Sequence, residues 1–325
     1  MKRTMALILT VVMMLGLTQS IALARGMTIG IVMQKENGAF LDMKAGILQK
    51  LAENGYTEDT ADIEYRCAQG DATALATICN SFDGFDLVFT IATPATQQFV
   101  NMESDTPCFF CAVSAPVAAG VITDMNAPDK NATGTSNAIP VENIFALADV
   151  LTPGISCYGL IYSTAETNAV NTVEACKKYL AARGIDYVAK AVNTSAEVAM
   201  ATEALIMDGC EAIFVPNDSN VQAGVSALVE LCMEYEIPTY CASATTVESG
   251  CLATIAIDDK GIGEKTADMA LAYLNGTAIE DIPSIVVDAD YVSVNVEMLA
   301  ALSLDMTETT LAVGETVYDV HYLGK

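Results

Sequence analysis

Short apolar runs alternate with longer stretches of helical periodicity along most of this 325-residue chain. An apolar, β-branched run at 27–33 is followed by helical spacing at 40–53, which ends at the helix-stop pair Asn54 and Gly55. The same reading predicts further strands at 63–67, 86–91 and 108–113, and further helices at 71–82 and 94–102. Repeated strand–helix–strand units predict a parallel sheet covered by helices on both faces.

The alternation breaks at residues 115–140, which are rich in Pro, Gly, Asn and Thr and are typical of a crossing between two lobes. It then restarts, with helices predicted at 141–151, 166–183, 196–208, 221–235 and 261–274, and strands at 156–162, 185–192, 212–215, 239–241, 251–257 and 284–287. We therefore predict an α/β fold of two doubly wound, Rossmann-like lobes with a ligand cleft between them. The N-terminal lobe is predicted to take 27–136 plus about 258–288, and the C-terminal lobe 137–257 plus about 289–325.

The N-terminus has the pattern of a secretory signal peptide. Lys2 and Arg3 precede an apolar run at 5–17, and Ala22-Leu23-Ala24 supplies an A-x-A cleavage site. The apolar run is shorter than the roughly 20 residues that a membrane span needs, which disfavours the alternative of a retained anchor helix. We predict a signal peptide at 1–24 and a mature protein that is exported and soluble, in the periplasm or outside the cell.

Composition narrows the function classes. The net charge of −26, or −28 without Lys2 and Arg3, repels nucleic acid and anionic membrane surfaces. Seven of the ten Cys residues lie in or beside apolar segments, which indicates core thiols rather than disulfides. Cys108 and Cys111 form a C-x-x-C, but on a strand they point to opposite faces. With one His, His321, in the chain, no metal and no cofactor are expected.

In open α/β sheets, ligands bind at the carboxyl ends of the strands. The loops there read QKENGAF, ATPAT, SAPV, STAETN, PNDSN and ASATT, and their one basic residue is Lys35. Without an Arg clamp they suit a zwitterion or neutral polar molecule better than a multiply charged anion. Thr93 as N-cap, with Pro94 at the first helical position, would present helix N–H groups to a carboxylate. Asp218 or Glu166 would then meet an ammonium group.

The stretches GIVMQ, IATPATQ, ATGTSNAIPVENIF, LTPGISCYGLIYSTAETNAV and AIFVPNDSNV occur in an order that resembles the ABC transporter substrate-binding family, whose characterised members bind aromatic amino acids. The resemblance covers nearly the whole mature chain. It implies a type I periplasmic-binding fold with three hinge crossings that closes on one small ligand. It also implies a monomer that delivers this ligand to a membrane permease with an ATPase partner.

The resemblance also implies site residues. Thr93 matches the carboxylate holder, Asp218 the ammonium partner, and Ser136 with Asn137 a hinge pair that is usually Ser-Asp. Asn137, Ala115 and Ser163 depart from frequent family residues, and Phe40 stands in a segment that differs from the family's. The predicted ligand-binding set, which includes Ser243 from the loop ASATT, is Gln34, Phe40, Thr93, Ser114, Ser136, Asn137, Ser163, Glu166, Asn168, Asn217, Asp218 and Ser243.

Each of these residues also has a plainer interpretation. Thr93 and Asp218 are good helix caps, Glu166 is an acid in a first helical turn, Asn137 suits a turn, and Phe40 suits a helix core.

The predicted function is capture of a small zwitterion, an aromatic or large apolar amino acid by resemblance, by the binding protein of an ABC importer. A ligand-sensing module for a chemoreceptor or signalling partner is the alternative, and sugar or nucleoside binding is less favoured. An enzyme is disfavoured because His321 lies outside the cleft loops and G-x-S-x-G and Walker motifs are absent. No catalytic residues are therefore predicted, and neighbouring permease and ATPase genes would distinguish transport from sensing.

Overall fold

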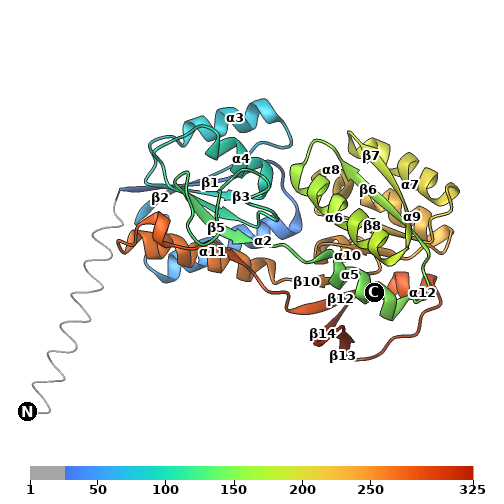
Figure 1. Ribbon diagram of the computed structural model, residues 1–325. Coiled ribbons are helices and arrows are strands. Elements are labelled where there is room, and N and C mark those ends of the chain that lie inside the picture. The colour runs from blue at the N-terminus through green and yellow to red at the C-terminus, as the bar shows by residue number, and fades with distance from the viewer. Residues whose placement is uncertain (1–25, 325) are drawn as a thin grey trace, which may run out of the picture. The chain divides into compact units, whose positions relative to one another are not determined.

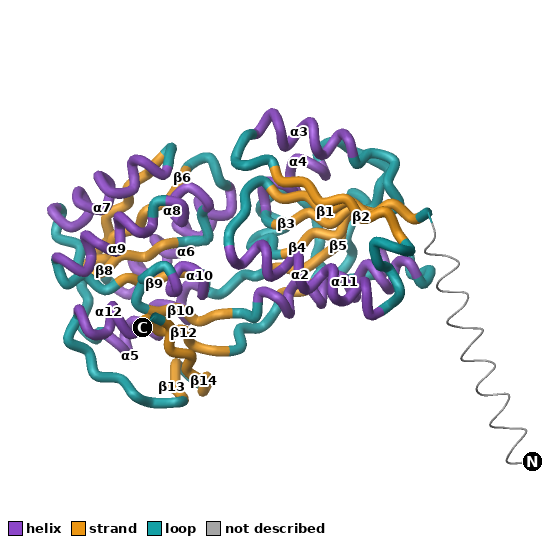
Figure 2. Tube along the Cα trace, turned by 180° about the vertical axis from the view of Figure 1, so that it is seen from behind, coloured by secondary structure: helices purple, strands orange, loops and turns teal. Residues whose placement is uncertain are grey.

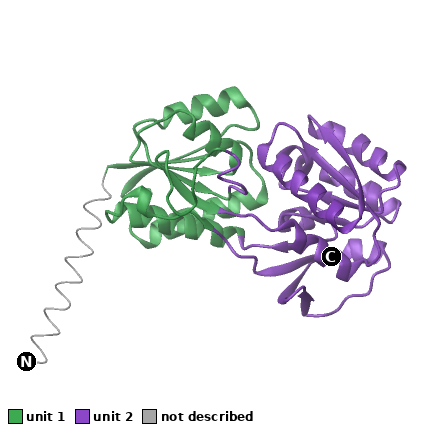
Figure 3. Ribbon diagram, viewed as in Figure 1, with its two compact units in different colours: residues 1–112, 120–135, 259–285 green, residues 113–119, 136–258, 286–325 purple. Residues whose placement is uncertain are grey.

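The computed structural model describes residues 26–324, which form two compact units (Figures 1 and 3). Unit 1 takes the described residues up to 112 together with 120–135 and 259–285, and unit 2 takes 113–119, 136–258 and the chain from 286 onward. The predicted signal peptide lies outside the described residues. Within 26–324, no helix combines the length and the apolar character needed to cross a membrane.

Unit 1 contains a six-stranded sheet of order β11-β5-β4-β3-β1-β2. Pairing from β2 through β1, β3 and β4 to β5 is parallel throughout, so the carboxyl ends of these strands meet at one edge. Buried apolar side chains fill both faces, as the continuous apolar runs predicted. Its strands are β1 (Met27–Met33), β2 (Ala61–Cys67), β3 (Leu87–Ile91), β4 (Cys108–Cys111), β5 (Ala132–Ser136) and β11 (Ile285–Val286).

Helices cover both faces of this sheet, with α3 (Ala72–Ser81) and α4 (Thr93–Val100) on one side, and α2 (Gly38–Glu53) and α11 (Asp259–Leu274) on the other (Figures 1 and 2). The short helix η2 (Ile279–Asp281) follows α11. The axes of α2 and α11 approach closely at two glycines. A Cβ added to Gly46 would lie 2.1 Å from the Lys260 carbonyl oxygen, and one added to Gly263 would lie 2.0 Å from that of Met43.

Unit 2 contains an eight-stranded sheet of order β13-β14-β12-β10-β9-β8-β6-β7. Its first five sequential strands are parallel, whereas β12 runs antiparallel to β10, and β13 and β14 form an antiparallel hairpin. Its strands are β6 (Cys157–Ser163), β7 (Asp186–Val192), β8 (Ala212–Val215), β9 (Thr239–Cys241), β10 (Ala253–Ala256), β12 (Tyr291–Asn295), β13 (Thr310–Val313) and β14 (Thr316–Leu323).

The helices of unit 2 pack in pairs, α5 on α6 and α7 on α9, around one apolar core. Gly184 ends α6 in the left-handed conformation, with φ of 68°, as its position after the helical pattern predicted. The helices are α5 (Val141–Leu151), α6 (Thr167–Arg183), η1 (Ser195–Glu197), α7 (Val198–Met207), α8 (Ser219–Ala223), α9 (Val225–Glu234), α10 (Ala244–Glu248) and α12 (Val296–Ala301).

The two-lobe α/β prediction is confirmed, and three local predictions are corrected. Residues 115–140 are not only a crossing, because they contain β5, an inner strand of unit 1. The single helix predicted at 221–235 is two helices, broken at Gly224, where an added Cβ would lie 2.6 Å from the Ser195 carbonyl oxygen. Beyond residue 288, sequence reasoning missed β12, α12 and the β13–β14 hairpin altogether.

Candidate functional site

The loops at the carboxyl edge of the unit 1 sheet contain backbone that L-residues seldom adopt. Gln69, Ala92 and Ala112 follow β2, β3 and β4, and their φ angles are 53°, 69° and 59°. Left-handed backbone at a non-glycine residue costs free energy and clusters at binding and catalytic loops. Glu103, Lys130 and Asn131 share this backbone elsewhere in unit 1, so the φ angles support this edge only together with the rule that ligands bind at carboxyl strand ends.

Helix α4 begins at this edge, one residue earlier than predicted. Ala92, not Thr93, is the N-cap, no side chain caps the first turn, and Pro94 lies within it. The prediction that Thr93 caps the helix is wrong, because the left-handed Ala92 already turns the chain and Thr93 has helical backbone. Thr93 is 2% exposed at the start of α4. A helix start without a side-chain cap suits an anionic group.

Gln34 and Phe40 flank the loop after β1. The backbone oxygen of Gln34 accepts a hydrogen bond from Gly70 N at 2.8 Å, and Phe40 N donates to Asn37 Oδ1 at 2.8 Å. Both side chains are half-buried. Thr93, Gln34 and Phe40 thus all stand at the carboxyl edge of one sheet.

Sequence reasoning missed a polar group beside this loop. The Tyr65 hydroxyl donates to Glu36 Oε1 at 2.6 Å, and Lys44 Nζ lies 3.9 Å from the Tyr65 ring centroid. Burial and the Glu36 carboxylate raise the pKa of Tyr65, so the phenol stays protonated and donates. Tyr65 on β2 and Lys44 on α2 thus lie together, and no sequence motif indicates this contact.

The Asp218 side chain accepts three backbone hydrogen bonds within unit 2. Its Oδ2 accepts from Ser163 N, and its Oδ1 accepts from Asn220 N at 2.9 Å and Val221 N at 3.1 Å. It is 1% exposed. The carboxylate therefore caps α8 and ties that helix to the end of β6, which supports the plainer interpretation of Asp218 as a helix cap. Contact with a ligand ammonium stays a prediction.

Burial raises the pKa of Asp218 above its ordinary value of 3.8, and it outweighs the three backbone N–H groups that lower it. A raised pKa in the folded state means that ionisation costs more there than in the unfolded chain. Wild-type stability should therefore fall as pH rises from about 3.8 to the raised pKa. Urea titrations across this range should show that fall, and the Asp218→Asn variant should lack it. An equal pH slope in both proteins would show that Asp218 is not its source.

Two more predicted residues join the same loops. Glu166 Oε1 accepts from Ser219 N at 3.0 Å, and Asn168 Nδ2 donates to the backbone oxygen of Asn217. The side-chain oxygen of Asn168 is buried and has no hydrogen-bond partner among the described residues. Buried polar atoms without partners are rare and often mark a place for a ligand or water. Ser243 is the N-cap residue of α10, but its side chain makes no capping bond, and its hydroxyl instead bonds that of Thr245 at 2.7 Å.

Ser114, Ser136 and Asn137 form a second polar group in unit 2. Ser114 Oγ donates to Asn137 Oδ1 at 2.8 Å, and Ser136 Oγ donates to the Ser114 backbone oxygen at 3.1 Å. The backbone oxygen of Ser136 accepts from Val287 N at 2.9 Å. These bonds connect three stretches of the chain: the loop after β4, the residues at the end of β5, and the residues that follow β11.

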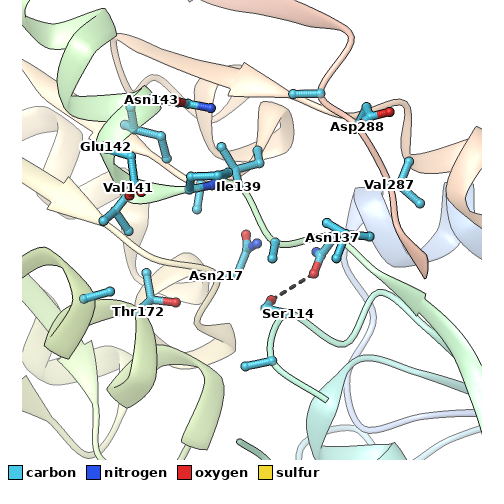
Figure 4. Close-up of a pocket in the computed structure, with 18 of the residues that line it drawn as sticks. Ser114, Asn137, Ile139, Val141, Glu142, Asn143, Thr172, Asn217, Val287 and Asp288 are labelled. Carbon is cyan, nitrogen blue, oxygen red and sulfur yellow. Dashed lines mark hydrogen bonds between the residues drawn. The ribbon is translucent and has the colours of Figure 1, made fainter. Parts of the chain in front are cut away.

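Unit 2 contains a cavity of about 750 Å³, which is lined by some residues of both polar groups described above (Figure 4). Ser114, Asn137 and Asn217 line it, whereas its described lining does not include Ser136, Ser163, Glu166, Asn168, Asp218 or Ser243. Glu142 and Asp288 are its charged residues, and the described lining contains no Lys, Arg or His. The apolar part of the wall consists of Ala115, Ala138, Ile139, Pro140, Val141, Ile144, Ala175, Phe214, Ala242, Val286, Val287 and Ala289.

Sequence reasoning missed several polar lining residues of the cavity: Asn143, Asn171, Thr172, Thr316 and Tyr318. Asn171 and Thr172 are the informative pair. Both lie on α6 and line the cavity, and the Asn171 Nδ2 is buried with no hydrogen-bond partner in the described chain. With Asn168 they follow the i, i+3, i+4 spacing of one helix face. That polar spacing within the helix was the available signal.

Comparison with known proteins identifies the family. A family profile described as ABC transporter substrate binding protein matches residues 28–317. The chain belongs to that family. This substrate-binding protein is also 30% identical, over 279 residues, to a tyrosine-binding protein of Clostridioides difficile strain R20291, an alignment that covers 85% of this chain and 81% of the relative.

Solved structures agree with the family and the fold. An ABC domain from Streptococcus pneumonia in complex with L-Trp is 29% identical, with a TM-score of 0.82, and the match covers 87% of this substrate-binding protein and 96% of that chain. A conserved domain protein from Vibrio cholerae is 28% identical, with a TM-score of 0.83, over 87% and 97% of the two chains. A glucose-galactose binding protein from Geobacillus stearothermophilus, at 15% identity and TM-score 0.57 over 82% and 96%, shares the fold alone. The predicted type I periplasmic-binding fold and family resemblance are thus confirmed.

Proposed function

We propose that this protein is the extracytoplasmic receptor of an ABC importer and binds an amino acid with an aromatic or large apolar side chain. The observation that carries the proposal is the unit 2 cavity, which combines amide and hydroxyl groups, two carboxylates and an apolar wall. Two of the similar proteins are described as binding tyrosine and as holding L-Trp. The protein then releases its ligand to a permease that works with an ATPase.

Each unit, taken by itself, offers groups that suit one of the two charges of a zwitterion. The first turn of α4 in unit 1 lacks a side-chain cap and suits a carboxylate. Unit 2 offers carboxylates to an ammonium group, and the described lining of its cavity includes no Lys, Arg or His to oppose one. The apolar residues Ile139, Val141 and Phe214 suit the ligand side chain. Specificity arises from desolvated hydrogen bonds and pocket shape, and no bond is made or broken.

In this proposal, ligand binding closes the two units by rotation at the chain crossings, a hinge motion common in binding proteins. Uptake of the bound amino acid into vesicles that contain the cognate permease and ATPase tests the delivery step. Binding without stimulated uptake would favour the ligand-sensing alternative.

The ligand class is tested by thermal unfolding with single amino acids and small sugars. A ligand at about 100 times its Kd should stabilise the folded protein by about 2.7 kcal/mol and raise Tm by several degrees. We expect the largest rise with tyrosine, tryptophan or phenylalanine. Glycine and aspartate are the matched controls, because they share the zwitterionic end and lack the apolar side chain. A rise with sugars alone would overturn the proposal.

Replacing Asn171 with leucine should change stability and affinity in opposite directions. The free energy of unfolding should stay equal or rise, because a buried donor without a partner is removed. Affinity for the identified amino acid should fall by about 1 kcal/mol, or roughly fivefold, if the Nδ2 donates to the ligand. Calorimetry measures the affinity, and Lys178→Leu on the exposed side of the same helix is the control. Unchanged affinity would remove Asn171 from the site.

A further inference from the structure

Two cysteines of unit 2 meet where neighbouring strands begin. Cys157 is the first residue of β6, and Cys210 lies just before β8. These strands pair in parallel, with Tyr158 opposite Ala212, and Glu211 N donates to the Cys157 backbone oxygen at 2.8 Å. The backbone thus holds the two residues on adjacent chains at one end of the sheet.

The two side chains also share a face. The Cys210 Sγ lies 3.4 Å from the position that a Cβ on Gly159 would take. Side chains two residues apart on a strand point to the same side, so Cys157 and Gly159 share a face of β6. The thiols of Cys157 and Cys210 are close enough that each shifts the pKa of the other through a side-chain interaction.

Solvent reaches this pair from one side. Cys157 is half-buried, whereas Cys210 is 3% exposed. Cys241 and Cys251 also interact through their side chains, but both are 0% exposed. The pair Cys157 and Cys210 therefore differs from the fully enclosed pair in having one thiol that a dissolved reagent can reach.

We propose that Cys157 and Cys210, which have free thiols in this structure, form a disulfide in the folded protein when it meets a small-molecule disulfide oxidant. The Cys157 thiolate, having lost its proton to water, attacks one sulfur of the oxidant, and the other sulfur leaves as a thiolate. The Cys210 thiol then loses its proton and attacks Cys157 of the mixed disulfide, releasing the second small thiol. Two protein thiols are oxidised, one disulfide of the oxidant is reduced, and two small thiols form.

The order of attack follows from the surroundings of each sulfur. Burial raises the pKa of Cys210 to about 12, so its thiol stays protonated at neutral pH. Burial and the nearby Asp186 and Glu211 carboxylates also raise the pKa of Cys157, but its sulfur is the one that solvent reaches, so it is the first nucleophile. Cross-link formation should therefore accelerate as pH rises from 7 to 9.

The cross-link lies away from the proposed binding residues. Ser163 ends β6 and Asn217 follows β8, whereas both cysteines stand where these strands begin. The bond should stabilise unit 2 by restricting the unfolded chain, and it should leave amino-acid affinity unchanged. This inference does not depend on the proposed function.

The test treats the folded protein with oxidised glutathione at pH 8, followed by denaturation, alkylation with iodoacetamide and intact-mass measurement. We expect two of the ten thiols to escape alkylation, a peptide that joins Cys157 to Cys210, and a raised urea midpoint that dithiothreitol reverses. Cys157→Ser and Cys210→Ser should each abolish the cross-link. Cys67→Ser, at another half-buried cysteine, should retain it.

Three results would overturn the inference. The first is alkylation of all ten thiols after oxidation, and the second is a cross-link between other cysteines. The third is glutathione that stays on Cys157 without being displaced, because it would show that Cys210 cannot reach the mixed disulfide.

Discussion

Replacing Asp218 with alanine is expected to destabilise unit 2 by on the order of 3 kcal/mol or more. The carboxylate accepts hydrogen bonds from the backbone of Ser163, Asn220 and Val221, and its side chain is almost fully buried. Each buried donor left without an acceptor costs about 1–3 kcal/mol. Urea unfolding followed by circular dichroism measures the loss.

Asp71→Ala is the matched control for this experiment. Asp71 also caps a helix, but it is exposed and accepts from the single backbone donor Ala74 N at 2.7 Å. Its removal should cost about 1 kcal/mol. If Asp218→Ala unfolds no more easily than Asp71→Ala, the carboxylate does not hold the two loops of unit 2 together. Amino-acid affinity of the Asp218→Asn variant then tests the separate prediction that Asp218 meets the ligand ammonium.

Replacing Gly263 with alanine should destabilise unit 1 by about 3 kcal/mol, at the upper end of overpacking costs. The added Cβ would lie 2.0 Å from the Met43 carbonyl oxygen, and backbone on α2 cannot yield as a flexible side chain can. A loss of stability would identify the close helix contact as the cause, because alanine normally stabilises a helix interior relative to glycine by up to about 1 kcal/mol. Thermal unfolding of the variant and the wild type measures the difference.

Lys265→Ala is the control for the helix crossing, since Lys265 is on the exposed side of α11. It should change stability by less than about 0.5 kcal/mol. Gly46→Ala should behave like Gly263→Ala, because its Cβ would meet the Lys260 carbonyl oxygen from the other helix. A Gly263→Ala protein as stable as wild type would show that α2 and α11 separate at little cost.

The alternation of apolar runs and helical spacing predicted most of both sheets, and the failures have physical reasons. Strand β5 reads ATGTS and lacks the apolar run of its neighbours, because Gly134 must admit the Phe110 backbone: an added Cβ would lie 1.9 Å from its oxygen. Strands β13 and β14 are largely exposed, so their sequences lack a continuous apolar signal. The break at Gly224 depends on η1, a contact that local sequence does not reveal.

Some loop residues of the candidate site could be predicted from the sequence, whereas the residues of α6 that line the cavity were missed. Ser114 and Asn217 follow predicted strands, and the rule that ligands bind at carboxyl strand ends selects them, whereas Asn137 follows the unpredicted β5 and was assigned from the family resemblance. Asn171 and Thr172 lie within a helix, where no loop rule applies, and their polar spacing with Asn168 on one helix face was the signal that could have found them. The contacts of Asp218 with Ser163 join residues 55 positions apart, so the sequence predicted a helix cap but not the link between loops.

The division of the chain has a consequence for synthesis. Unit 1 needs α11 and β11, which leave the ribosome after all of β6 to β10, and unit 2 in turn needs β12 to β14 from the last stretch of the chain. The unit 1 sheet therefore stays incomplete until β11 has emerged from the ribosome, and the unit 2 sheet stays incomplete until β14 has emerged. A nascent chain stalled near residue 258 should remain protease-sensitive in both halves, unlike proteins whose domains finish folding one after another from the N-terminus.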